Sequence, residues 1–269
     1  MSAGAGPLSG RRVAVTRARE QSGALVEALA RLGADVIEAP AIELVEPPDW
    51  QPLDHALLRL TSFDWIVWTS ANALPRLRAR LQALDLEPDL IGRLPARHLA
   101  VGPATGRGLV AVGIAPEVVG SDFRAEGIVE HLAREPLAGR TIWLPRALEG
   151  RDLLPDALRE RGAEVVVTPV YASRPSPGGV APARAALEDG TLDAVTFTSG
   201  AIAQAFVAAL AGASLAHVVR ASIGPVTSQA LEALGLAPQV EAREATVPAL
   251  VVALVEHYAG PIADTEEAP

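Results

Sequence analysis

The chain contains neither cysteine nor lysine, and each absence excludes a class of chemistry. Without cysteine there is no disulfide, no thiolate ligand for a metal and no thiol nucleophile. Without lysine there is no Schiff base, no anchor for pyridoxal phosphate and no Walker-type amine for a phosphate. All 23 basic residues are therefore arginine, whose guanidinium group can hold a carboxylate through two hydrogen bonds.

Several motifs of known ligand sites are missing as well. No GxGxxG turn follows the first predicted strand, no GxSxG elbow occurs, and the five histidines lack the spacing of metal ligands. We therefore expect neither a metal site nor a dinucleotide-binding turn. The formal net charge of −9 argues against nucleic acid as a partner, because binding to phosphates needs a basic face.

Long hydrophobic runs are also absent. None approaches the roughly 20 residues that a membrane-spanning helix needs. The first ten residues, MSAGAGPLSG, lack the charged start and the apolar centre of a secretory signal. We therefore expect a cytoplasmic protein that has no membrane partner.

What the sequence does contain is an internal repeat in three parts, which together extend over much of the chain. A duplication of this length predicts two similar domains with a cleft between them. The repeated segments are 12–40 with 140–169, 63–73 with 192–202, and 100–119 with 221–240. They superpose Arg17 on Arg146, Ser70 on Ser199, Gly102 on Gly224, and Thr105 on Thr227.

Short apolar runs alternate with segments of helical spacing throughout both halves. Continuous apolar strands favour parallel pairing with both faces of the sheet covered, and the alternation predicts an α/β fold. The proline- and glycine-rich segment 173–183 is typical of a surface connection or hinge, and residues 1–10 and 261–269 of loose tails. The expected strands are 13–16, 36–37, 64–68, 98–101 and 117–119, then 141–144, 165–167, 194–197, 221–223 and 239–241.

Hydroxyl side chains follow several predicted strands at the point where a helix begins. In a parallel α/β sheet these turns line the carboxyl edge, where ligands bind and where backbone N–H groups favour anions. The alternative is that each hydroxyl only caps its helix. Arg17 and Arg146 follow matched strands and could hold carboxylates there, or form surface ion pairs. The hydroxyl residues are Thr69, Ser70, Thr105, Thr198, Ser199 and Thr227.

Tyr171 is one of only two tyrosines, and it lies directly after a predicted strand and just before segment 173–183. A phenol keeps its proton at neutral pH and can donate a hydrogen bond or a proton. The alternative role is packing against the connection, since tyrosine is often half-buried.

Taken together, several of these turns resemble the uroporphyrinogen-III synthase family. The motifs are VTRA from Val15, TSANA from Thr69, VGPAT from Val101, GRDLLPDALRERGAEV from Gly150, TPVYASRP from Thr168, FTSG from Phe197 and IGPVTSQAL from Ile223. The resemblance implies two flavodoxin-like parallel-sheet domains joined by a two-stranded linker, with the first domain discontinuous. Domain 1 would comprise 1–39 and 172–262, domain 2 would comprise 43–168, the linkers 40–42 and 169–171, and a loose tail 263–269.

The resemblance also implies a reaction. The family is a cofactor-free lyase of porphyrin and heme biosynthesis. It closes hydroxymethylbilane, a linear tetrapyrrole with eight carboxylates, with loss of water and inversion of the last pyrrole ring, to give uroporphyrinogen III. The alternatives are a non-catalytic two-lobed module that binds a tetrapyrrole or another polyanion, and a solute-binding protein of the periplasmic type.

On this reading the partner is a small-molecule substrate, and the protein is a monomer with transient contact to hydroxymethylbilane synthase. Tyr171 matches the linker tyrosine of the family and is the expected catalytic residue. The expected substrate-binding residues are Arg17, Thr69, Ser70, Gly102, Thr105, Arg146, Thr198, Ser199, Gly224 and Thr227.

Overall fold

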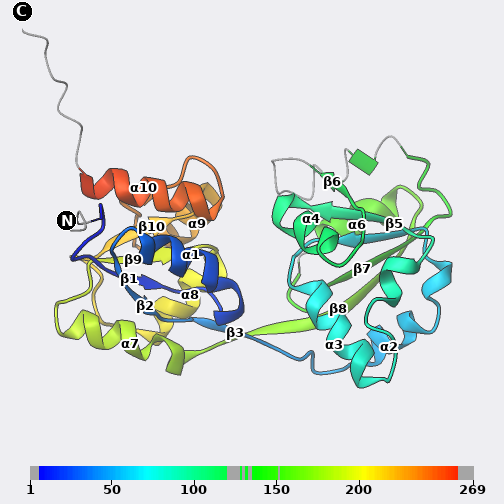
Figure 1. Ribbon diagram of the computed structural model, residues 1–269, viewed down its shortest axis with the longest axis horizontal. Coiled ribbons are helices and arrows are strands. Elements are labelled where there is room, and N and C mark those ends of the chain that lie inside the picture. The colour runs from blue at the N-terminus through cyan, green and yellow to red at the C-terminus, as the bar shows by residue number, and fades with distance from the viewer. Residues whose placement is uncertain (1–5, 120–127, 129–130, 133–134, 151, 260–269) are drawn as a thin grey trace, which may run out of the picture. The chain divides into compact units, whose positions relative to one another are not determined.

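The computed structural model describes residues 6–119, 128, 131–132, 135–150 and 152–259. The predicted tail 263–269 lies outside these residues. The chain divides into two compact units, drawn in Figure 1. Unit 1 is discontinuous and comprises Met1–Glu43 and Arg174–Pro269, and unit 2 comprises Leu44–Ser173.

Unit 1 is built on a five-stranded sheet in the order β11-β10-β9-β1-β2, and each neighbouring pair is parallel. Its strands are β1 (Arg12–Val15), β2 (Asp35–Glu38), β9 (Ala194–Phe197), β10 (Val219–Ser222) and β11 (Val240–Glu241). Its helices are α1 (Arg19–Arg31), α7 (Pro177–Glu188), α8 (Gly200–Ala209), α9 (Pro225–Ala233) and α10 (Val247–Ala259).

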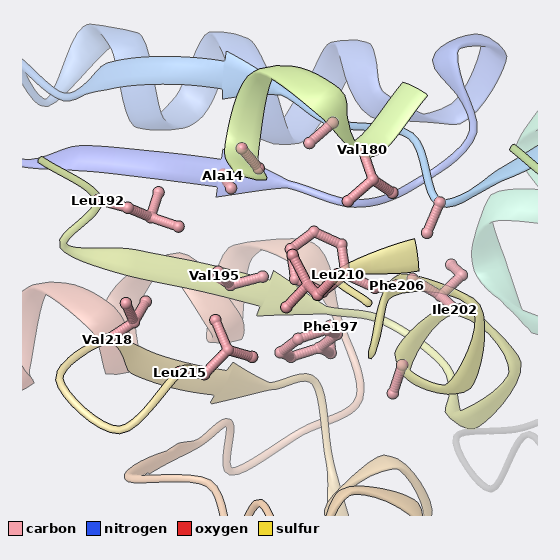
Figure 2. Close-up of a cluster of buried hydrophobic side chains, with 14 of the residues drawn as sticks. Ala14, Val180, Leu192, Val195, Phe197, Ile202, Phe206, Leu210, Leu215 and Val218 are labelled. Atoms are coloured by element: carbon pink, nitrogen blue, oxygen red, sulfur yellow. The ribbon is translucent and has the colours of Figure 1, made fainter. Parts of the chain in front are cut away.

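Both faces of this sheet are covered, which explains why the inner strands β1 and β9 carry consecutive buried residues. Along β1, Ala14 packs into one cluster with Val195 and Phe197, beneath α7 and α8 (Figure 2). Val13 and Val15 point to the opposite cluster, beneath α1 and α10. Because successive side chains of a strand point to opposite faces, β1 contributes residues to two separate hydrophobic cores.

Unit 2 contains a six-stranded sheet in the order β3-β8-β7-β4-β5-β6, in which the strands from β8 to β6 pair in parallel. The predicted α/β class with two parallel sheets is thus confirmed. The strands are β3 (Ile42–Val45), β4 (Trp65–Trp68), β5 (Arg97–Val101), β6 (Glu117–Val119), β7 (Thr141–Ala147) and β8 (Glu164–Pro175). The helices include α2 (Gln51–Leu57), α3 (Ala73–Ala83), α4 (Gly102–Val110) and α6 (Leu153–Glu160).

One aspartate in each unit performs the same structural task at the amino ends of the strands. The Asp64 carboxylate accepts the backbone N–H of Thr141 at 2.8 Å and pairs with Arg140 at 2.7 Å. The Thr141 hydrogen bond is the main reason why the pKa of Asp64 lies below its usual value. Asp193, at the matching place in the repeat, accepts the N–H of Arg12 at 2.8 Å. These aspartates align strands at the edge opposite to the candidate site.

Segment 173–183 was expected to be a surface connection or hinge, and it contains the boundary between the units at Ser173 and Arg174. It nevertheless has regular structure, because β8 extends to Pro175 and α7 begins at Pro177. Proline is tolerated in the first turn of a helix, where its missing N–H would have no partner. The expectation of a loose tail at 1–10 is wrong for its described part: Leu8 is fully buried, and its N–H donates to the Leu32 carbonyl at 2.9 Å.

Across the described part of the chain, no helix combines the length and the apolar character needed to cross a membrane.

Candidate functional site

The predicted turns of unit 2 meet at the carboxyl edge of two neighbouring strands. Thr69 and Ser70 follow β4, and Gly102 opens α4 directly after β5, which pairs with β4 in register. The φ angle of Gly102 is +79°, a left-handed conformation that only glycine adopts without cost. Thr105 lies in the first turn of α4 and is 6% exposed. Four of the predicted site residues therefore share one edge.

Tyr171 reaches the same edge from β8. Its phenol donates a hydrogen bond to Ser70 Oγ, with 3.3 Å between the two oxygens. Ser70 Oγ also accepts the backbone N–H of Asn72 at 3.2 Å. Tyr171 is only 6% exposed, which suits the packing alternative, but packing alone does not need a polar contact with Ser70. The structure therefore joins the predicted catalytic residue to a predicted substrate-binding residue.

Arg146 lies at the end of β7 and is already engaged within unit 2. Its side chain is 10% exposed and forms an ion pair with Asp152 at the start of α6. A Cβ added to Gly150 would lie 2.8 Å from Arg146 Cδ, so the arginine passes directly beneath this turn. Arg146 thus stabilises the loop between β7 and α6, as the ion-pair alternative expects.

Between α3 and α4 lies a small cavity of about 80 Å³. Its position brings Ser70 and Thr105, from two different turns, to one space. Arg78 is its only charged side chain among the described lining residues. The cavity is lined by Trp68, Ser70, Ala71, Leu74, Pro75, Arg78, Thr105, Gly108, Leu109 and Val112.

In unit 1 the matching turns occupy the matching edge but differ in detail. Ser199 is the N-cap of α8, and its Oγ accepts the N–H of Ile202 at 3.2 Å, as the capping alternative expects. Thr198 precedes it and is half-buried. Gly224 opens the turn before α9 with a φ of 161°, which is extended and not left-handed, and Thr227 is 4% exposed.

Arg17 follows β1 at this edge of unit 1 and has no carboxylate partner among the described residues. Its Nη2 donates to the side chain of Gln21 at 3.4 Å, and its Nε is buried without a hydrogen bond. Burial lowers the pKa of Arg17, because desolvation disfavours the charged form. An anionic ligand would stabilise the charged form of this guanidinium, and no described carboxylate competes for Arg17.

Sequence reasoning missed two side chains of unit 2. Arg78 stands in a run of arginines on α3, and only its spacing of four from Leu74 could have placed it on the cavity face. His98 was one of five scattered histidines. It is 8% exposed, and its Nδ1 accepts the Trp68 indole N–H at 3.1 Å. Burial lowers the pKa of His98 to about 4.

Parallel sheets with hydroxyl-bearing turns and arginines at their carboxyl edges define a two-domain α/β protein of the class whose ligand sites lie at those edges. The profile of the family described as uroporphyrinogen-III synthase HemD matches residues 23–252. The chain belongs to the uroporphyrinogen-III synthase family and is an enzyme of that kind, a cyclising lyase.

Individual relatives agree with this assignment. A Synechococcus elongatus protein named uroporphyrinogen-III synthase is 34% identical over 256 residues, which cover 92% of this chain and 96% of that protein. A Chlorobaculum parvum protein of the same name is 30% identical over 227 residues, which cover 83% and 89%. A mutant uroporphyrinogen III synthase from the extremely thermophilic bacterium Thermus thermophilus shares the fold, with a TM-score of 0.63 at 24% identity over 91% of this chain and 97% of that one.

Proposed function

We propose that the chain closes hydroxymethylbilane to uroporphyrinogen III, with loss of water and inversion of the last pyrrole ring. The observation that carries the proposal is the contact between Tyr171 and Ser70, which joins the linker tyrosine to a hydroxyl turn at a carboxyl edge. Membership of the family supports the reaction, and the side chains present suit it. The chemistry needs neither a cysteine thiol nor a lysine amine, and the chain contains neither side chain.

The main task of the protein in this reaction is positioning. The free bilane closes spontaneously to the isomer in which the last ring is not inverted. The enzyme must therefore hold the chain so that, after the hydroxyl leaves, the cationic azafulvene is attacked at the substituted carbon to give a spiro intermediate. The many carboxylates of the substrate can be held by backbone N–H groups at helix starts and by arginine. Arg17, unpaired with any described carboxylate, is suited to this role.

Tyr171 is the proposed proton donor to the departing hydroxyl. Its 3.3 Å contact with Ser70 is long, since O–H···O hydrogen bonds are usually about 2.7–2.8 Å. The phenol can therefore exchange this hydrogen bond for one to the leaving oxygen at small cost, and it then donates its proton there so that water departs. The substrate loses a proton when the ring is completed, which restores the phenol. The proposed substrate-binding residues are Arg17, Thr69, Ser70, Gly102, Thr105, Arg146, Thr198, Ser199, Gly224 and Thr227.

The proposal also covers the setting of the enzyme. We propose a monomer that acts in the cytoplasm, meets hydroxymethylbilane synthase transiently and uses no cofactor. Its domains would be 1–39 with 172–262 and 43–168, with linkers at 40–42 and 169–171. Support for the last point comes from β3 and β8, which are neighbouring strands and each continue across a boundary between the units.

The test is a coupled assay. Hydroxymethylbilane is generated in the reaction vessel, the protein is added, and the porphyrinogens are oxidised and separated by isomer. We expect type III to dominate with the protein and type I without it. Formation of type I alone in both samples would refute the proposed reaction.

A further inference from the structure

The cavity between α3 and α4 of unit 2 has no assigned role in the reaction. Its walls are mostly apolar, from Trp68 at the end of β4 to Leu74 on α3 and Leu109 on α4. The polar groups Ser70, Thr105 and Arg78 also line it. A short side chain with an apolar stem and a polar tip would match both kinds of surface.

The charge of the lining favours an anion. Arg78 is a cation, and no carboxylate occurs among the described lining residues. Arg78 Nη2 lies 2.9 Å from the exposed Asp89 carboxylate, while its Nε is buried without a hydrogen bond. Exposed ion pairs of this kind contribute little to stability, because solvent screens them. The guanidinium can therefore turn to a ligand in the cavity at little cost.

The hydroxyl groups of Ser70 and Thr105 also favour a ligand that accepts hydrogen bonds. A serine oxygen accepts two hydrogen bonds and donates one. Both accepting positions of Ser70 are filled, by the Tyr171 phenol and by the N–H of Asn72, so its proton is left for a third partner. The Thr105 hydroxyl has no hydrogen bond to another described group, and Thr105 stands in the first turn of α4, where the helix dipole favours negative charge.

We propose that this cavity binds one carboxyl-bearing side chain of the substrate and that Arg78 is a further substrate-binding residue. The methylene stem lies against Trp68 and Leu109, and the carboxylate accepts hydrogen bonds from Arg78 and the two hydroxyls. The inference rests on the proposed function, because that reaction supplies a substrate with such side chains. Tyr171, through its contact with Ser70, then also helps to orient the ring that carries the bound side chain.

The first test measures binding without turnover. Sodium acetate and sodium propionate are titrated into 15N-labelled protein at constant ionic strength, with sodium chloride as the blank. We expect amide shifts concentrated at Ala71, Thr105 and Gly108, larger for the acid whose length fits the cavity, and about tenfold weaker binding in Arg78→Leu. The control Arg107→Leu removes the same charge from α4 outside the cavity and should bind like wild type. Shifts spread over the surface, or equal in Arg78→Leu and wild type, overturn the proposal.

The second test uses the coupled assay. Arg78→Leu should raise KM about tenfold and increase the share of type I product, whereas Arg107→Leu should change neither. The two tests distinguish a failure of the proposed reaction from a failure of the proposed role of the cavity. If wild type makes no type III isomer, the proposed reaction is wrong, and the carboxylate titration alone decides whether the cavity binds such groups. If wild type makes type III and Arg78→Leu matches it in KM and product ratio, the substrate does not use the cavity.

Discussion

At the scale of single residues, a phenol and a serine hydroxyl meet at the carboxyl edge of unit 2. Their 3.3 Å contact is close enough to orient both groups and long enough to be exchanged for a substrate oxygen. A substitution at Tyr171 can therefore remove the aromatic ring, the phenolic proton or both, and these changes affect kcat and KM differently.

Replacing Tyr171 with phenylalanine keeps the ring and removes only the hydroxyl. We expect type III formation to fall several-fold while KM barely changes, because the proton is needed only when the hydroxyl leaves. The other tyrosine supplies a control: the Tyr258 phenol donates to the Asp193 carbonyl at 3.1 Å in unit 1, and Tyr258→Phe should turn over like wild type. Unchanged turnover in Tyr171→Phe would reduce its role to packing.

His98 makes the stability of the protein depend on pH. Burial holds its pKa at about 4 in the folded chain, against about 6.5 when unfolded. Below pH 6.5 the His98 imidazole binds a proton in the unfolded chain, whereas in the folded chain it stays neutral down to about pH 4. The contribution of neutral His98 to the free energy of unfolding is therefore fully present above pH 6.5. It is lost as the pH falls towards 4, by roughly 3 kcal/mol at most.

Urea unfolding at pH 7 and pH 4.5 measures this effect. Wild type should lose more stability between the two values than His98→Leu, which has no imidazole to protonate. The variant is expected to be less stable at pH 7, because the Trp68 indole N–H loses its acceptor. An equal pH response in both proteins would show that His98 is already protonated, or accessible to water, in the folded state.

At the scale of elements, the two matched Gly-Pro turns have different backbones. Gly102 has a φ of +79°, whereas Gly224 is extended, with a φ of 161°. Gly102→Ala should therefore cost about 1–2 kcal/mol of unfolding free energy. Gly224→Ala should cost less than about 0.5 kcal/mol, because its new Cβ would meet Ala245 Cβ at an ordinary 3.5 Å. Denaturant unfolding of both variants checks the difference, and equal losses would contradict it.

Helix α7 offers a second matched pair, in adjacent positions. A Cβ at Gly179 would lie 2.2 Å from the Pro40 carbonyl oxygen, whereas a Cβ at Gly178 meets nothing within 4 Å. We expect Gly179→Ala to destabilise unit 1 by about 1–3 kcal/mol through overpacking. Gly178→Ala should stabilise it by up to about 1 kcal/mol through helix propensity. Thermal unfolding gives the sign of each change, and a stabilising Gly179→Ala would be the contrary result.

Helix α7 also shows which features could not be predicted from the sequence. Apolar runs such as WIVW at β4 predict strands because hydrophobicity is local, and these strands were found. The proline and glycine density of segment 173–183 predicted a surface connection or hinge, but it did not reveal that Gly179 packs closely against Pro40, a contact distant in sequence. The meeting of Tyr171 and Ser70 could not be predicted from spacing either, since it depends on the order of strands in the sheet.

At the scale of the whole molecule, the two units differ in how the chain builds them. Unit 2 is one continuous segment, Leu44–Ser173. Unit 1 needs both ends of the chain, because β1 lies inside its sheet between β9 and β2. Without β1 and α1, the core formed with α10 loses one of its two helices. The resemblance to a known family indicated this discontinuity, which the repeat alone does not reveal.

Separate fragments test this difference. Leu44–Ser173 expressed alone should show α/β circular dichroism and a cooperative urea transition, because it retains its own sheet and core. Arg174–Pro269 alone should not, and adding the fragment Met1–Glu43 should restore its transition. Cooperative unfolding of Arg174–Pro269 by itself would show that β1 and α1 are dispensable for unit 1.

The pairing of β1 with β9 also sets an order of events during synthesis. Val13 pairs with Ala194, so about 180 residues must be translated before β1 meets this neighbour, which takes roughly 10–40 s at 5–20 residues per second. Leu44–Ser173 emerges complete within that interval. β1 can pair with β2 and pack against α1 soon after it emerges, but its other edge stays without a partner until β9 has followed, and this is the period in which a chaperone would matter most.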